Sequence, residues 1–212
     1  MAKSFIFDMD GTLLHSMIYW YNSGARICVK YFDDPKIVEQ LSKMSARELV
    51  IYAKQTLSEE QTKNFRKEWY QAMLDHYMND ITMVEGVVEF LEKAKKAGIR
   101  MGIATGTPEY MSVPALQKFG LLDYFEFVIS EDTIGKGKSE PDIYVTAANK
   151  LGAKIEDCVV FEDGLHGAKS AKKLGMKLVG IYDEIGKVYE QELRDLADLY
   201  IYNFENLEPT KL

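Results

Sequence analysis

The chain has 212 residues, of which 47% are hydrophobic and 28% charged, and this balance excludes a disordered, collagen-like or coiled-coil protein. Its formal net charge of −7 argues against a protein that coats nucleic acid. No apolar run approaches the roughly 18 residues of a membrane helix, and acidic residues interrupt the N-terminal apolar stretch before a signal peptide could form. Two distant cysteines, Cys28 and Cys158, indicate neither a disulfide framework nor a zinc cluster. We therefore expect a cytoplasmic enzyme or binding protein without a membrane or nucleic-acid partner.

The first segment, residues 3–8, is a short apolar run that predicts a buried strand. Residues 16–80 differ, because apolar residues such as Phe65, Trp69 and Met73 recur there at helical spacing. Ser58, followed by two glutamates, is typical of a helix start. We predict three to four helices and no strand in residues 16–80, which we call the helical insert.

From about residue 82 the pattern changes to alternating helices and strands. Glycines follow most of the predicted helices, which cover residues 87–97, 108–119, 141–151, 164–174 and 187–196; Pro114 should kink or restart the second. The predicted strands are 99–104, 125–130, 158–161, 177–181 and 199–202. Repeated strand–helix–strand units predict an α/β fold with a Rossmann-like, doubly wound parallel sheet. We predict a core domain of residues 1–15 and 81–212, with the insert as a second domain.

Acidic residues follow two of the predicted strands. Asp8 and Asp10 come after the first, and Glu162 and Asp163 after the strand 158–161. Ligands of open α/β sheets bind at the carboxyl ends of the strands, and alternate residues of a strand share a side. Any one of these residues could be a solvated loop residue or a helix cap. As a set, they predict carboxylates that would repel one another without a cation, and such oxygen ligands suit Mg²⁺.

Two further segments add groups that favour an anion. Thr105-Gly106-Thr107-Pro108 precedes a predicted helix, whose first N–H groups attract anions, although capping by Thr107 would explain the same residues. Lys138 is the cation we expect in the site. The run from Gly135 to Ser139 is no P-loop, because Asp132 stands where that pattern needs a glycine.

In order and context, these residues resemble the four motifs of the haloacid dehalogenase superfamily: Asp8-x-Asp10-Gly11-Thr12, Thr105, Lys138 and Glu162-Asp163. The stretches Lys138–Tyr144 and Phe161–Ala168 resemble its β-phosphoglucomutase-like phosphatase branch, and the resemblance covers essentially the whole chain. It implies that the helical insert is an α-helical cap that closes over the site. It also implies a Mg²⁺-dependent phosphatase that hydrolyses a small phosphorylated metabolite, such as a sugar phosphate, as a monomer or weak dimer.

The resemblance also implies a role for each motif residue. Asp8 would be the nucleophile that forms an aspartyl-phosphate, and Asp10 the general acid and base, which requires a raised pKa. The phosphoryl oxygens would be held by Thr105, Gly106 and Lys138. Mg²⁺ would bind Asp8, the Asp10 backbone carbonyl and Asp163, with Glu162 close by. Candidate substrate contacts in the cap are Tyr19, Trp20 and Arg47, and at least one of the consecutive aromatic residues 19–21 should belong to the cap core.

Three other functions are alternatives to a phosphatase. A β-phosphoglucomutase-type mutase is the nearest alternative, but those mutases carry His where this chain has Trp20 and Arg near Ala46, and tend to lack Thr at the position of Thr12. A dehalogenase would have no role for Asp10 or the acidic pocket. A phospho-accepting or non-catalytic binding module of the receiver type is a third alternative, but such modules have about 120 residues and no helical insert.

Overall fold

A computed structural model of the chain describes residues 4–33, 36–40 and 44–212, so Lys3, which the sequence places in the first strand, lies outside the described residues. Within them, a six-stranded sheet has the order β3-β2-β1-β4-β5-β6, and every neighbouring pair is parallel. The strands are β1 (Ser4–Phe7), β2 (Arg100–Thr105), β3 (Val128–Ser130), β4 (Cys158–Glu162), β5 (Lys177–Ile181) and β6 (Leu199–Ile201). The predicted doubly wound α/β fold is confirmed.

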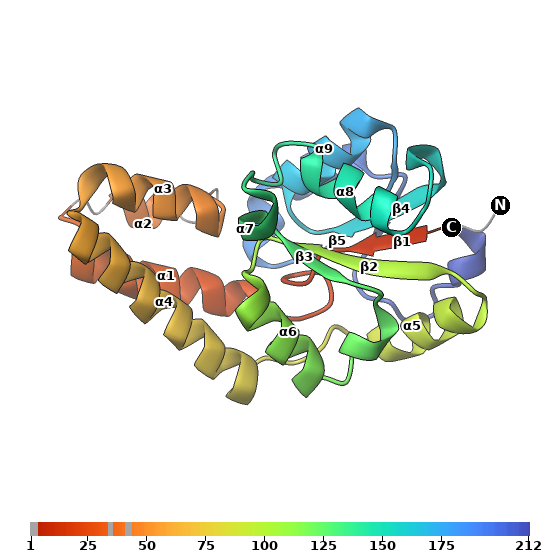
Figure 1. Cartoon of the computed structure of the whole chain (residues 1–212), viewed down its shortest axis with the longest axis horizontal. Helices are drawn as coiled ribbons and strands as arrows, with labels where there is room; N and C mark the ends of the chain where they lie inside the picture. Colours follow the sequence, from red (N-terminus) through yellow and green to blue (C-terminus); the bar gives the residue numbers. More distant parts are fainter. Residues whose placement is uncertain (1–3, 34–35, 41–43) are drawn as a thin grey trace.

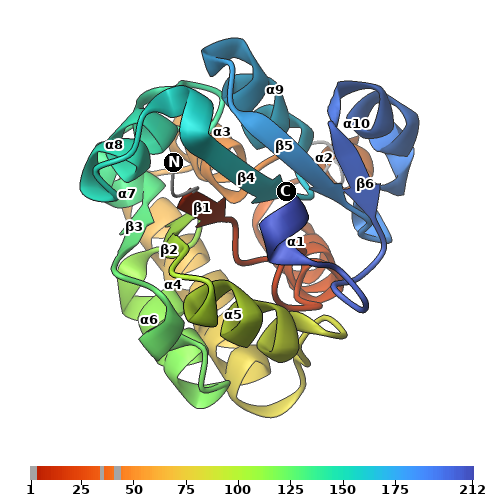
Figure 2. The same ribbon diagram turned by 90° about the vertical axis from the view of Figure 1, so that its right-hand side faces the viewer.

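Helices cover both faces of this sheet (Figures 1 and 2). On one face lie α5 (Val87–Lys96) and α6 (Glu109–Lys118), and on the other α8 (Asp142–Lys150), α9 (Leu165–Leu174) and α10 (Glu190–Leu196). The central strand β1 shows why: Phe5 and Phe7 belong to the first apolar core, whereas Ile6 between them belongs to the second. Alternate side chains of a strand point to opposite faces, so a buried strand with apolar side chains on both faces needs cover on both.

The helical insert contains α1 (Met17–Tyr31), α2 (Lys36–Gln40), α3 (Ala46–Thr56) and α4 (Glu59–Asn79), and no strand among its described residues. Figure 1 shows these helices grouped to one side of the sheet. Ser58 begins α4 as predicted, in a capping box with Gln61, and Ser45 begins α3 in the same way with Glu48. The aromatic spacing in α4 buries Phe65 and Trp69 inside the insert. The division into two domains stays a prediction.

Several predicted elements differ from the structure. The strand predicted for 125–130 is limited to β3, because the edge strand has one neighbour and residues Leu122–Tyr124 form a 3₁₀ turn before it. A second 3₁₀ turn, Ile185–Tyr189, replaces the first part of the helix predicted for 187–196. The predicted restart at Pro114 is wrong: α6 continues through it, held by buried Met111, Ala115 and Leu116.

Three short elements complete the described chain. The helix α7 (Glu131–Ile134) precedes the Lys138 loop and was not predicted, since four residues give no helical periodicity. Further 3₁₀ turns lie at Ile155–Asp157 and Pro209–Lys211. Of the helices that the structure describes, none has both the length and the apolar character needed to cross a bilayer.

Candidate active site

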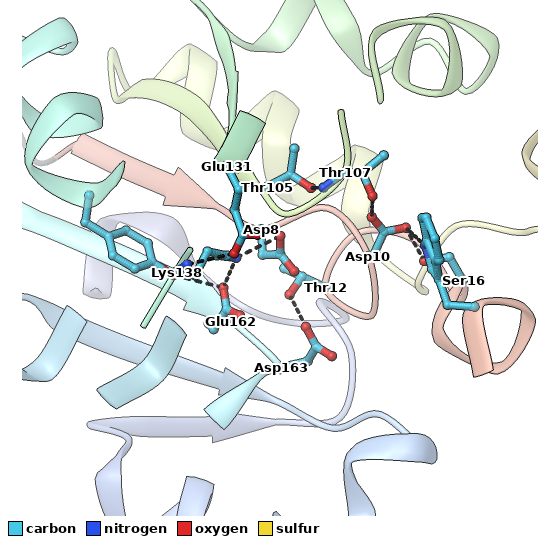
Figure 3. A network of polar contacts seen from close by, with 12 residues as sticks. Asp8, Asp10, Thr12, Ser16, Thr105, Thr107, Glu131, Lys138, Glu162 and Asp163 are labelled. Atoms are coloured by element: carbon cyan, nitrogen blue, oxygen red, sulfur yellow. Dashed lines mark hydrogen bonds and ion pairs between the residues drawn. The ribbon is translucent and has the colours of Figure 1, made fainter. Parts of the chain in front are cut away.

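Three buried carboxylates meet where β1 and β4 end (Figure 3). The parallel register pairs Phe7 with Phe161, so the residues that follow these two strands emerge side by side. One carboxylate oxygen each from Asp8, Glu162 and Asp163 lies within 4.8 Å of the others, and we call these residues the acid cluster. The predicted meeting of strand ends therefore occurs for these three residues.

Lys138 lies against the acid cluster and is itself buried. Its Nζ is 2.9 Å from Asp8 Oδ1 and 2.6 Å from Glu162 Oε2, and Tyr144 Oη donates to the same Glu162 oxygen at 3.1 Å. Although burial alone would lower the pKa of Lys138, the charges of Asp8 and Glu162 hold it well above its ordinary value. Lys138 is therefore a permanent cation beside Asp8.

The electrostatics of the acid cluster favour a bound cation. Burial raises the pKa of Asp8 to about 6, although Lys138 opposes this shift. Burial, then the charges of Asp8 and Glu162, raise the pKa of Asp163 well above its ordinary value. Two of the three carboxyl groups thus resist ionisation although the charge of Lys138 opposes this, and a divalent cation would remove the cost of ionising them. Buried oxygen donors from three side chains fit Mg²⁺, which prefers such ligands.

Asp10 does not join the acid cluster, which corrects the expectation of four converging carboxylates. Its side chain turns the other way in Figure 3, and four groups donate hydrogen bonds to it. The strand ends at Phe7, so the alternation of a strand does not govern residues 8 and 10. The donors are Ser16 Oγ at 2.6 Å, Thr107 Oγ1 at 2.7 Å, Trp20 Nε1 at 3.2 Å and Tyr77 Oη.

The pKa of Asp10 is nevertheless raised, as its expected role requires. Burial is the main cause and the charge of Asp8 the second, while hydrogen bonds from Ser16, Tyr77 and Thr107 act in the opposite sense. Coordination of a metal ion by the Asp10 backbone carbonyl stays a prediction.

The segment expected to bind phosphate follows β2. Thr105 is fully buried, and its Oγ1 accepts a hydrogen bond from Thr107 N at 3.1 Å. Gly106 and Thr107 line a cavity above the acid cluster, whereas Thr105 does not. The alternative that Thr107 caps α6 is wrong, because Pro108 is the N-cap residue and the Thr107 hydroxyl donates to Asp10.

This cavity has a volume of about 510 Å³ and lies between the helical insert and the strand ends. Of the predicted substrate contacts, Trp20 and Arg47 line it and Tyr19 does not: the Tyr19 hydroxyl donates to Asp80 O at 3.2 Å and its ring packs on His76. Trp20 is also part of the insert core, edge-to-face with Trp69. Arg47 Nη2 donates to Gly135 O at 2.8 Å, in the loop before Lys138.

Sequence reasoning missed three side chains of the site. Glu131 is buried and accepts a hydrogen bond from Lys138 N at 2.7 Å, which fixes the loop that carries the lysine. Tyr77 is buried in the insert core, and helical spacing alone does not signal that its hydroxyl donates to Asp10. Tyr144, within the motif that begins at Lys138, contacts Glu162, and only its place in that motif could have signalled it.

Comparison with known proteins agrees with this geometry. The model of the haloacid dehalogenase-like hydrolase family matches residues 5–181. A phosphorylated carbohydrates phosphatase of Thermotoga maritima is 27% identical over 180 residues, which are 84% of this chain and 83% of that protein. A β-phosphoglucomutase of Bacillus subtilis is 28% identical over 191 residues, 84% of this chain and 83% of that protein.

A solved structure of a hydrolase has the same fold as this chain. The crystal structure of a family IA, variant 3 hydrolase from Entamoeba histolytica superposes with a TM-score of 0.83 at 25% identity, covering 99% of this chain and 96% of that one. The resemblance carried by the four motifs is thus confirmed: the chain is an enzyme of the haloacid dehalogenase-like hydrolase family, in the branch that includes phosphatases and β-phosphoglucomutase.

Proposed function

We propose that this hydrolase is a Mg²⁺-dependent phosphatase, which cleaves a small phosphomonoester through an aspartyl-phosphate on Asp8. The observation that carries the proposal is the placement of Asp8 in the acid cluster with one oxygen 2.9 Å from Lys138 Nζ. A carboxylate attacks an anionic phosphate only where charge is neutralised. Lys138 is the cation already present there, and a divalent ion on the acid cluster would supply the rest.

The first step transfers the phosphoryl group to the enzyme. An oxygen of Asp8 forms a bond to phosphorus while the bond from phosphorus to the ester oxygen breaks. Asp10 donates a proton to the departing alcohol, which needs the raised pKa described above. Because Asp10 now faces Ser16 and Tyr77, its side chain must rotate toward the substrate before it can act.

The second step restores Asp8. Asp10, now ionised, takes a proton from a water molecule whose oxygen attacks phosphorus, and the bond between Asp8 and phosphorus breaks to release phosphate. Bound Mg²⁺ would be held by Asp8 and Asp163, with Glu162 beside it, and would stabilise charge on the transferring group. The helical insert, whose residues line the cavity, would limit access of bulk water during the first step.

Two substitutions test the proposal. Asp8→Asn should lower phosphate release from 4-nitrophenyl phosphate on the order of 10³-fold or more, because the nucleophile is lost. Asp10→Asn should also stop turnover while Mg²⁺ binding persists, since only its backbone is expected to contact the ion. The exposed Asp123→Asn should change neither, and EDTA should abolish the activity of the native enzyme.

The alternatives give different results in the same assay. A non-catalytic binding module would release no phosphate at any Mg²⁺ concentration. A mutase would release little and would interconvert sugar phosphates instead. Full activity of Asp8→Asn would rule out the aspartyl-phosphate.

A further inference from the structure

The walls of the cavity above the acid cluster are largely apolar and aromatic. The insert contributes Trp20 and Trp69, whose rings meet edge-to-face with centroids 5.2 Å apart, together with Leu49. The core side contributes Tyr189. A cavity of about 510 Å³ is of the size that holds a whole small molecule, so these walls would surround the leaving group rather than the phosphate.

The rim of the cavity is also apolar, and it is open. Ile51 of α3 is 43% exposed and Val188 of the 3₁₀ turn Ile185–Tyr189 is 60% exposed, and both residues line the cavity. They come from the insert and the core respectively. Large apolar side chains that face a binding cavity from both sides are stabilised when an apolar ligand covers them.

Several polar groups of the wall already have partners. Trp20 Nε1 and Thr107 Oγ1 donate to Asp10, and Ser45 and Glu48 bond to each other's backbone in the capping box of α3. Trp69 Nε1 is a buried donor of the wall without a hydrogen-bond partner, and it could serve one hydroxyl group. A sugar ring would bring several hydroxyl groups into the cavity, and the paired groups named above offer them no partner.

Charge argues against a second anionic group in the ligand. Among the described residues that line the cavity, six are carboxylic acids, whereas the basic side chains are one arginine, one lysine and one histidine: Arg47, Lys138 and His166. Lys138 is paired with the acid cluster. Arg47 donates to Gly135 O, and burial raises the pKa of the nearby Glu131 although the charges of Lys138 and Arg47 oppose that rise. Four of the six acids lie where the first phosphoryl group would react, and both Lys138 and Arg47 already have partners among the described residues. A second phosphate would therefore gain little attraction from the cavity wall.

We propose that the substrate is the monophosphate of an uncharged alcohol that carries a flat apolar ring, and that sugar phosphates and bisphosphates are poor substrates. This inference rests on the proposed phosphatase function. It assigns the leaving-group wall of Trp20, Trp69, Ile51 and Val188 as the element that selects the ring.

Three esters of primary alcohols test the proposal, because their leaving groups are chemically alike: benzyl phosphate, glucose 6-phosphate and fructose 1,6-bisphosphate. With Mg²⁺ present, kcat/KM for benzyl phosphate should exceed that for glucose 6-phosphate by at least about tenfold, as expected for burial of one ring. Fructose 1,6-bisphosphate should be the poorest of the three. Equal or higher kcat/KM for glucose 6-phosphate would overturn the inference and leave the phosphatase function intact.

A binding measurement reads the same preference without turnover. The two tryptophans of the chain, Trp20 and Trp69, both line the cavity, so intrinsic tryptophan emission reports on its occupant. Benzylphosphonate, which has no ester bond to cleave, should change this emission. Ethylphosphonate should compete with it at least about tenfold more weakly. Equal affinity for the two phosphonates would overturn the inference even if no ester were hydrolysed.

A pair of matched substitutions locates the effect. Ile51→Lys places a cation in the wall, and should reduce benzyl phosphate use while it raises the relative kcat/KM for fructose 1,6-bisphosphate. Ile18→Lys is the control, because Ile18 is 42% exposed but lies outside the cavity lining. The same change in both variants would contradict the assignment of the wall.

Discussion

A Cβ atom on Gly11 would lie 2.2 Å from Asp163 Oδ2. The carboxylate of Asp163, which follows β4, therefore occupies space that a side chain at position 11 would fill. Gly11 also has φ = +78°, a backbone conformation that L-residues adopt at a cost. One residue thus meets two demands, a turn after the strand and space for Asp163. The glycine of the Asp-x-Asp-Gly motif thus leaves space for a member of the acid cluster.

Gly11→Ala should therefore damage the site more than the fold. We expect a destabilisation of about 1–2 kcal/mol from the positive φ, together with strongly weakened Mg²⁺ binding because Asp163 must move. Gly98→Ala is the matched control, since Gly98 has φ = +73° and nothing within 4 Å of its Cβ position. Isothermal titration with Mg²⁺ and thermal unfolding of both variants separate the two effects. Unchanged Mg²⁺ affinity in Gly11→Ala would contradict the role given to the glycine.

Tyr77 is expected to set the protonation of Asp10. Its hydroxyl donates to Asp10, and this bond opposes the rise in the Asp10 pKa that burial causes. Tyr77→Phe removes the bond and keeps the ring, so the pKa of Asp10 should rise further. The limb of the kcat/KM–pH profile that Asp10 controls, which reports the free enzyme, should move to higher pH.

The control for this substitution is Tyr19→Phe, because the Tyr19 hydroxyl donates to Asp80 O and not to the site. Its profile should match that of the native enzyme. A profile of Tyr77→Phe that moves to lower pH, or not at all, would show that the tyrosine does not act on Asp10.

The sequence predicted the residues of the acid cluster because strand ends are local features. In a parallel sheet the carboxyl ends share one edge, so Asp8 and the pair Glu162-Asp163 had to approach once β1 and β4 were neighbours. The same reasoning placed Lys138 near them, although it could not foresee that Glu131 would hold its loop.

The direction of Asp10 could not be predicted in this way. It depends on donors at positions 16, 20, 77 and 107, which come from the insert as well as from the core, and whose meeting requires the complete tertiary structure. The helix α7 escaped prediction, and the strand predicted for 125–130 was too long, for a related reason. Elements as short as α7 and β3 have no periodic pattern, so contacts with their neighbours decide their conformation.

Arg47 should support the site through the loop that carries Lys138. Its guanidinium donates to Gly135 O at 2.8 Å and also lines the cavity. Hydrogen bonds from charged groups contribute about 1.5–3 kcal/mol, so Arg47→Ala should lower kcat/KM on the order of tenfold or more.

Arg66→Ala is the comparison for Arg47→Ala. Arg66 also reaches from the insert to this segment, where it contacts Asp132 at 2.7 Å, but the pair is exposed and Arg66 does not line the cavity. Exposed ion pairs contribute at most about 1 kcal/mol, so the kcat/KM of this variant should stay within a few-fold of native. An equal loss of kcat/KM in the two variants would mean that any contact between the insert and this loop has the same effect, and that the position of Arg47 in the cavity lining has none of its own.

The acid cluster should make the stability of the metal-free protein depend on pH. Burial raises the folded-state pKa of Asp8 to about 6 and that of Asp163 well above its ordinary value. A raised carboxyl pKa stabilises the folded state when the group is protonated, and this contribution is lost as pH rises through about 6. In EDTA at pH 7.5, the native protein should therefore melt at a lower temperature than Asp8→Asn, whose side chain at position 8 cannot ionise. The difference in melting temperature between the two proteins should be smaller at pH 5.

Mg²⁺ should reverse this loss, because it binds the ionised carboxylates. At a concentration near 100 times its Kd the ion adds about 2.7 kcal/mol, which is roughly 5–10 °C in melting temperature for a chain of this size. The gain should be larger at pH 7.5 than at pH 5, where protons compete for the same oxygens, and it should be small in Asp8→Asn. A gain from Mg²⁺ that is equal at the two pH values would mean that the ion stabilises the protein somewhere other than the carboxylates after β1 and β4.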